Sequence, residues 1–200
     1  MRKKSILFIA VFALIAFISV SNISRASGDL AVGAKFEGFT LPDTTGKQHS
    51  YKSLKGENGA VVIYLSIQCP VVKDYDERIN QLAADYKAKG INFIGINSNY
   101  TEDLGEIKTH AAATYKFPVL IDKDNVLADK MGATVTPEIY YFDAKDVLLY
   151  EGAIDNDRRG KNITDNYARA AFDSGLSGKA IERTKENAFG CSIKRVKKAE

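Results

Sequence analysis

A buried strand followed at once by a helix, with a cysteine at the junction, constrains this sequence most. Residues 60–65 form an unbroken apolar run, which is typical of a strand covered on both faces. From residue 71 to 87, apolar side chains recur every three or four residues, as on one side of a helix. Cys69 and Pro70 stand between these elements, and proline is well accommodated at the first position of a helix. The sequence therefore places Cys69 at the N-terminus of this helix.

This position favours a reactive thiolate at Cys69. The unpaired N–H groups of the first turn and the positive end of the helix dipole stabilise the charged form. Lys73, one turn later, adds positive charge. The alternative is a buried structural thiol or one half of a structural disulfide, for which the sequence offers a single partner, Cys191.

The rest of the sequence predicts an alternation of strands and helices that ends in a hairpin. Further strands are expected at 36–41, 91–96, 118–122, 138–142 and 147–150, and further helices at 101–115, 126–131 and 162–174. Thr101 is the expected cap of the helix at 101–115, and residues 178–195 have the pattern of an irregular tail. This order predicts an α/β fold in which helices cover both faces of a mixed central sheet.

The first 26 residues have the layout of a secretory signal peptide. Three basic residues precede an apolar stretch at 6–20, and residues 24–26 fit a small-x-small cleavage site. The alternative is an uncleaved membrane anchor, although the apolar stretch has about 15 residues and a bilayer-spanning helix needs about 20. We expect an exported protein, periplasmic or secreted, with one domain at 27–177 and a tail at 178–200 that carries Cys191.

The charge balance does not indicate nucleic-acid binding, and the histidines do not indicate a metal site. The sequence has 28 basic and 25 acidic residues, and cleavage after residue 26 would leave 24 basic and 25 acidic ones. This balance gives no argument for nucleic-acid binding. His49 and His110 are too few and too far apart for a metal site, and no motif requires a flavin or a nucleotide. We therefore expect no cofactor.

The order of elements resembles the thioredoxin fold, and in particular its redoxin branch, the alkyl hydroperoxide reductase/thiol-specific antioxidant superfamily. Within that branch the chain is similar to exported peroxiredoxin-like proteins. The resemblance lies in residues 68–73, 96–99, 115–122, 132–137 and 190–194. Two departures stand beside it: Val72 replaces the second cysteine of thioredoxin-like disulfide reductases, and Val62 replaces a proline of typical peroxiredoxins. Lys73 stands where copper-delivery redoxins carry their second cysteine, which argues against that function.

The resemblance implies a set of site residues around Cys69. Ser66 could supply the hydroxyl that peroxiredoxins place three residues before their reactive cysteine, and Pro70 follows that cysteine directly. The Thr136–Pro137 bond is expected to be cis, because only X-Pro bonds adopt this form at low cost. In the resemblance, this loop faces the reactive cysteine, and its backbone receives an extended substrate.

Cys191 is the candidate resolving thiol, since the sequence has no other. A disulfide between it and Cys69 would close a loop of about 120 residues. By lowering the conformational entropy of the unfolded chain, it would stabilise the folded state by about 5 kcal/mol, so a permanent structural bridge is a competing interpretation. Arg158 and Arg159 could lower the pKa of a nearby thiol, but paired charges in a surface loop are the favoured interpretation.

The sequence thus predicts an exported thiol oxidoreductase of thioredoxin fold. Cys69 would attack a disulfide in a protein or a hydroperoxide, and Cys191 or an external thiol reductant would resolve the product. The alternative is a redox-inert binding module that holds an extended peptide beside Thr136 and Pro137. A membrane is expected to be a partner only through an uncleaved signal.

Overall fold

The computed structural model describes residues 30–197 of the chain. The predicted signal peptide at 1–26 lies outside these residues. Among the helices of residues 30–197, none combines the length and the apolar character that crossing a membrane requires.

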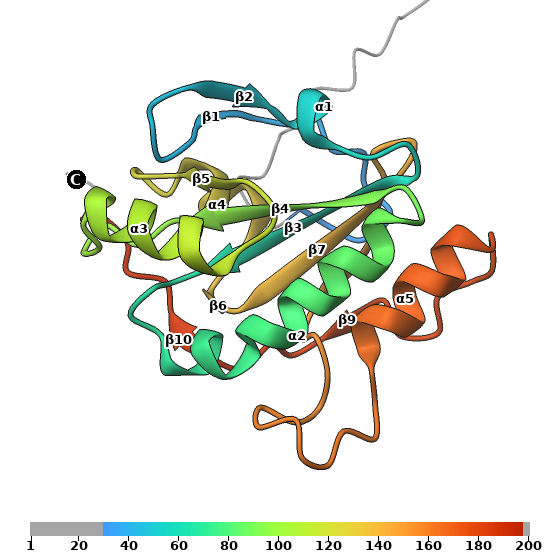
Figure 1. Cartoon of the computed structure of the whole chain (residues 1–200). Helices are drawn as coiled ribbons and strands as arrows, with labels where there is room; N and C mark the ends of the chain where they lie inside the picture. The colour runs from blue at the N-terminus through green and yellow to red at the C-terminus, as the bar shows by residue number, and fades with distance from the viewer. Residues whose placement is uncertain (1–29, 198–200) are drawn as a thin grey trace, which may run out of the picture.

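A six-stranded mixed sheet forms the centre of the molecule, as the sequence predicts (Figure 1). Its strands, in spatial order, are β5 (Val119–Ile121), β4 (Ile91–Asn97), β3 (Gly59–Leu65), β7 (Glu138–Asp143), β8 (Leu148–Gly152) and β9 (Lys185–Glu186). β3, β4 and β5 run parallel, β7 is antiparallel to β3, β8 is antiparallel to β7, and β9 lies parallel to β8. All seven residues of β3 are buried, which explains the unbroken apolar run of this strand.

Alternate side chains of β3 enter two separate hydrophobic clusters, one on each face of the sheet. The first cluster contains the buried side chains of α2 (Pro70–Lys87) and α5 (Tyr167–Leu176), together with Ile107 of α3 (Leu104–Thr114). The second contains side chains of α1 (Tyr51–Leu54) and α4 (Val126–Met131). Helices therefore cover both faces of the sheet, as in the thioredoxin-like fold that the sequence resembles (Figure 1).

Two small two-stranded sheets flank the central one. β1 (Thr40–Pro42) pairs with β2 (Gln48–Ser50), and β6 (Val135–Thr136) pairs with β10 (Cys191–Ser192). Figure 1 shows β10 next to β6 and to the start of α2. This second pair brings the end of the chain to the helix N-terminus that carries Cys69.

Several element boundaries differ from the sequence-based expectations. The strand expected at 36–41 is confined to β1, and Phe36 instead stacks on Phe142 with ring centroids 4.6 Å apart. The helix expected from Thr101 begins at Leu104, because the Asp103 carboxylate accepts hydrogen bonds from the N–H groups of Gly105 (2.8 Å) and Glu106 (3.1 Å).

The last helix and the tail also differ from the expectation. The helix expected from residue 162 begins only at Tyr167, because residues 156–165 form a loop held by its own side chains. The tail expected to be irregular contains β9 and β10, and two residues per strand are too few to show a hydrophobic period.

Candidate active site

Cys69 occupies the junction between β3 and α2 that the sequence predicts. It is the N-cap residue of α2, and Pro70 takes the first position of the helix. Its side chain is 1% exposed, and its thiol donates a hydrogen bond to the carbonyl oxygen of Thr136 over 3.3 Å. The sulfur therefore lies between the start of a helix and the loop that precedes β7.

That loop contains the cis Thr136–Pro137 peptide bond, so the expectation of a cis proline is confirmed. The Glu138 carboxylate accepts hydrogen bonds from the N–H groups of Thr134 (2.8 Å) and Val135 (3.4 Å), which fixes the approach to β6. Burial raises the pKa of Glu138, and these two N–H groups partly oppose that effect. The carbonyl of Thr136 is thereby held towards Cys69.

Cys191 lies beside the same loop, although it is far from Cys69 in the sequence. In the antiparallel pair of β6 and β10, Cys191 stands opposite Thr136 and Ser192 opposite Val135. Both cysteines are free thiols, and Cys191 is partly exposed whereas Cys69 is buried. The fold thus brings together the two thiols that the sequence singles out.

The surroundings of the two thiols shift their pKa values in opposite directions. Burial alone would raise the pKa of Cys69, but hydrogen bonds from the Cys191 thiol, the Val72 N–H group and the Thr136 side chain lower it below its ordinary value. Burial and the neighbouring Cys69 sulfur raise the pKa of Cys191. Cys69 is therefore the thiol that ionises first, and Cys191 is a proton donor beside it.

A carboxylate that the sequence analysis did not single out organises the loop before Cys69. Glu102 accepts hydrogen bonds from the N–H groups of Ile67 (3.1 Å) and Gln68 (3.3 Å) and from the Asn97 amide (2.6 Å), and also from the Ser66 hydroxyl. Ser66 therefore bonds to Glu102 rather than pointing its hydroxyl group freely towards a substrate. Nothing in the sequence links Glu102 to residues 66–68, because this contact joins two loops at the ends of different strands.

The cationic residues considered from the sequence bond elsewhere or lie at the surface. Arg158 Nε bonds to the Asp74 carboxylate over 2.6 Å, so it pairs with a surface charge, as favoured from the sequence, and only weakly lowers the pKa of Cys191. Arg159 and Lys73 are exposed. The low pKa of Cys69 therefore depends on hydrogen bonds rather than on an ion pair.

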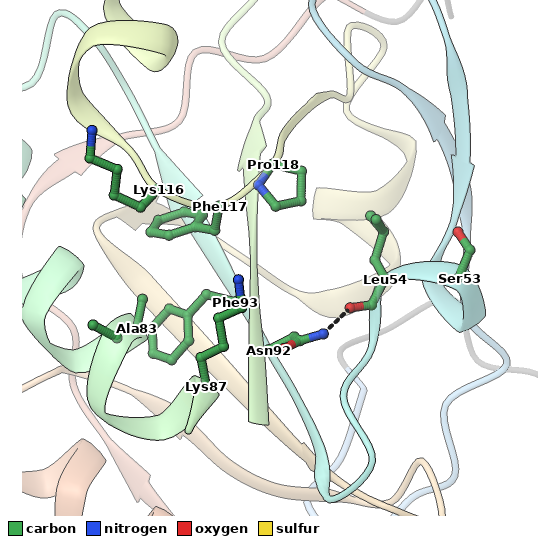
Figure 2. A pocket seen from close by; sticks show the side chains of 10 residues that line it. Ser53, Leu54, Ala83, Lys87, Asn92, Phe93, Lys116, Phe117 and Pro118 are labelled. Atoms are coloured by element: carbon green, nitrogen blue, oxygen red, sulfur yellow. Dashed lines mark hydrogen bonds between the residues drawn. The ribbon is translucent and has the colours of Figure 1, made fainter. Parts of the chain in front are cut away.

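A separate pocket of about 320 Å³ lies at the other end of α2 (Figure 2). Its walls include Ala83, Lys87, Phe93, Phe117 and Pro118, and no cysteine. Ala84, which also lines the pocket, lies about 22 Å along the helix from Cys69, at about 1.5 Å per residue. This pocket is not part of the thiol site.

Within residues 30–197, no three side chains of His, Cys, Asp or Glu converge in a way that could hold a metal ion. His49 instead bonds to the Asp43 carboxylate over 2.8 Å.

The fold and the paired thiols together define a redoxin of the thioredoxin-like class. The chain belongs to the AhpC/TSA family, whose sequence pattern matches residues 32–151. The thiol-disulfide oxidoreductase ResA of Bacillus anthracis is 26% identical over 159 residues, which cover 77% of this chain and 90% of ResA. These similarities make the chain a member of a family of oxidoreductases.

Two solved structures share the fold over most of the chain. A hypothetical protein of Sinorhizobium meliloti superposes with a TM-score of 0.77 at 31% identity and covers 84% of this chain and 97% of its own. Peroxidoxin BcpB of Mycobacterium tuberculosis, with a TM-score of 0.54 and 17% identity over 74% of this chain and 95% of its own, shares the fold.

Proposed function

We propose that the chain is an exported thiol oxidoreductase in which Cys69 is the nucleophile and Cys191 is the resolving thiol. The observation that carries the proposal is the meeting of the two thiols at the N-terminus of α2. There the Cys69 thiol bonds to the carbonyl of Thr136, and Cys191 stands opposite Thr136 in the pair of β6 and β10. Export is proposed from the signal-like pattern of residues 1–26.

The reaction begins with the Cys69 thiolate. With a hydroperoxide, the thiolate attacks the terminal oxygen, the O–O bond breaks, and the alkoxide takes up one proton and leaves as an alcohol, so that Cys69 becomes a sulfenic acid. With a disulfide, the thiolate forms a mixed disulfide and the second sulfur of the substrate leaves as a thiolate. Pro70, Thr136 and Pro137 are proposed to line the space in which the substrate meets the sulfur, whereas the Ser66 hydroxyl is engaged by Glu102.

Cys191 completes either route. Its sulfur attacks the oxidised Cys69 sulfur, and water or the remaining substrate thiol leaves while the Cys69–Cys191 disulfide forms. An external dithiol then reduces this disulfide and is itself oxidised. The pairing of β10 with β6 supports this role, because Cys191 stands opposite the residue whose carbonyl bonds Cys69.

The same pairing weighs against a redox-inert module that holds an extended peptide. The edge of β6 beside Thr136 is occupied by the chain's own β10. A peptide that used this edge would have to displace residues 191–192. We therefore favour the oxidoreductase over the binding module.

The test is the fate of the two thiols on oxidation. Purified protein treated with one equivalent of hydrogen peroxide should lose both free thiols and, in a non-reducing peptide map, yield one cross-linked peptide pair that contains Cys69 and Cys191. Cys191→Ser should instead yield a sulfenic acid at Cys69, while Cys69→Ser should leave Cys191 a thiol. Two free thiols in the treated wild type, or cross-links only between molecules, would contradict the proposal. A disulfide that resists dithiothreitol in the folded protein would make the bridge structural.

A further inference from the structure

Residues 187–196, here named the C-terminal strap, pass beside Cys69 and are held to the rest of the domain both before and after Cys191. Immediately before it, β9 pairs with β8 of the central sheet. After Cys191, the strap is held by the buried side chain of Ile193 and by hydrogen bonds to four parts of the domain. These bonds are Ile193 N to Thr134 O (3.0 Å), Lys194 N to Asn99 Oδ1 (2.8 Å), Arg195 Nε to Asp129 Oδ1 (2.8 Å) and Val196 N to Asn125 Oδ1 (2.8 Å).

Within the strap, Gly190 lies directly against the carbonyl of Thr136. A Cβ atom at this position would overlap that carbonyl. The same oxygen accepts the hydrogen bond of Cys69. The strap is thus in contact with the group that bonds the reactive sulfur, and no second strand fits between the strap and β6.

This arrangement decides which oxidants can reach Cys69. A disulfide in an extended polypeptide carries its backbone with it, and that backbone needs hydrogen-bond partners when it is buried beside the sulfur. The edge of β6 next to Cys69 offers such partners, and β10 already uses it. A molecule of a few atoms makes no such demand, so it needs only local movement of side chains to reach a buried sulfur.

We propose that the C-terminal strap is the specificity element of the site: it excludes extended polypeptide disulfides from Cys69 and leaves the sulfur to oxidants of a few atoms, such as hydrogen peroxide. This inference rests on the proposed redox role of Cys69. It adds that Gly190, which touches no reacting atom, determines specificity by letting the strap lie on Thr136.

The chemistry that follows is confined to the two thiols and a small oxidant. The Cys69 thiolate takes one oxygen from the hydroperoxide and releases the alcohol after the alkoxide gains a proton. Cys191 then gives up its proton and displaces the oxygen of Cys69 as water, with formation of the disulfide. An external dithiol supplies the two electrons that restore both thiols.

The experiment compares a polypeptide disulfide with hydrogen peroxide on strap variants. Gly190→Val places a side chain against the Thr136 carbonyl and should displace the strap while both thiols remain. Ser192→Val is the matched control, because Ser192 lies in the same strap and its side chain is exposed. Pre-reduced proteins are mixed with a disulfide-linked pair of ten-residue peptides or with hydrogen peroxide, and the oxidation state of Cys69 is followed by mass spectrometry.

We expect the wild type and Ser192→Val to react with hydrogen peroxide and only slowly with the peptide disulfide. Gly190→Val should react with the peptide disulfide about 10-fold faster, because the freed edge offers two or three backbone hydrogen bonds. Ile193→Ala, which removes the buried anchor of the strap and keeps both thiols in the full chain, should show a gain in the same direction, which keeps the test valid if Gly190→Val folds poorly.

Equal reaction of wild type and both strap variants with the peptide disulfide would overturn this inference alone. Faster reaction of the wild type with the peptide than with peroxide would overturn it as well. Failure of Cys69 to react with either oxidant in every variant would overturn the proposed function itself, and this inference with it. The pattern of rates therefore distinguishes the two failures.

Discussion

Replacement of Glu102 by alanine tests whether one carboxylate holds the loop that presents Cys69. The carboxylate accepts four hydrogen bonds, from Ser66, Ile67, Gln68 and Asn97. The Ser66 hydroxyl and the Asn97 amide are buried, whereas the N–H of Gln68 belongs to an exposed residue that water can reach.

The expected loss follows from the two buried donors. Each buried donor without a partner costs about 1–3 kcal/mol, so the loss of a partner for two of them should lower the free energy of unfolding of Glu102→Ala by about 2–6 kcal/mol. Glu102→Gln keeps one oxygen acceptor but turns an NH₂ group towards two donors, so it should lose about half as much. Hydrogen exchange of the Ile67 and Gln68 amides should also become faster in both variants.

Urea unfolding followed by circular dichroism measures these changes as shifts of the midpoint at constant slope. Glu77→Ala is the matched control, because Glu77 is exposed on α2 and its loss should change stability by no more than about 0.5 kcal/mol. If Glu102→Ala falls within that same range, the hydrogen bonds of Glu102 do not support the loop and the reasoning is wrong.

Two further predictions concern the pKa of Cys69 and the ion pair of Arg78 with Asp155. The alkylation rate of Cys69 should rise with pH through a midpoint below about 8.5. Cys191→Ala should shift this midpoint upward, and Cys191→Ser should shift it less, because serine keeps a hydrogen-bond donor. A midpoint near 9 in the wild type would refute the assignment of a lowered pKa to Cys69. Arg78→Ala should destabilise the fold by about 2–3 kcal/mol, because the partly exposed Arg78 pairs with Asp155, which is 2% exposed. Arg158→Ala removes an exposed ion pair with Asp74, so in the same urea experiment it should lower the free energy of unfolding by no more than about 1 kcal/mol and serves as the control for Arg78→Ala.

The elements that the sequence predicts well are the long ones. β3, α2 and β4 each contain at least seven residues; the two strands are mostly apolar and almost wholly buried, and the buried positions of α2 follow the helical period. The position of Cys69 follows from these boundaries. The cap at Asp103 was also within reach, because Glu106 three residues later completes a capping-box pattern that Thr101 lacks.

The contacts that complete the site were beyond a reading of local patterns. β6 and β10 contain two residues each, and their pairing joins segments more than fifty residues apart. Glu102 reaches back to a loop 34–36 residues earlier. Such contacts depend on how the strands stack in space, so a lone glutamate or glycine gives no local sign of them. The sequence pointed to Cys191 because it is the only other cysteine of the chain, but it gave no sign that the fold would bring Cys191 to Cys69.

The loop after β4 touches both thiol-bearing segments without containing a thiol. Glu102 holds the residues before Cys69, while Asn99 Oδ1 accepts from Lys194 N and Tyr100 N donates to Lys194 O (3.0 Å). A backbone movement that changes the separation of the two thiol-bearing segments strains these attachments or the loop itself. The loop is therefore a mechanical link between the segments. We therefore expect the amide NMR resonances of residues 99–102 to shift between the dithiol and the disulfide form of Cys69 and Cys191.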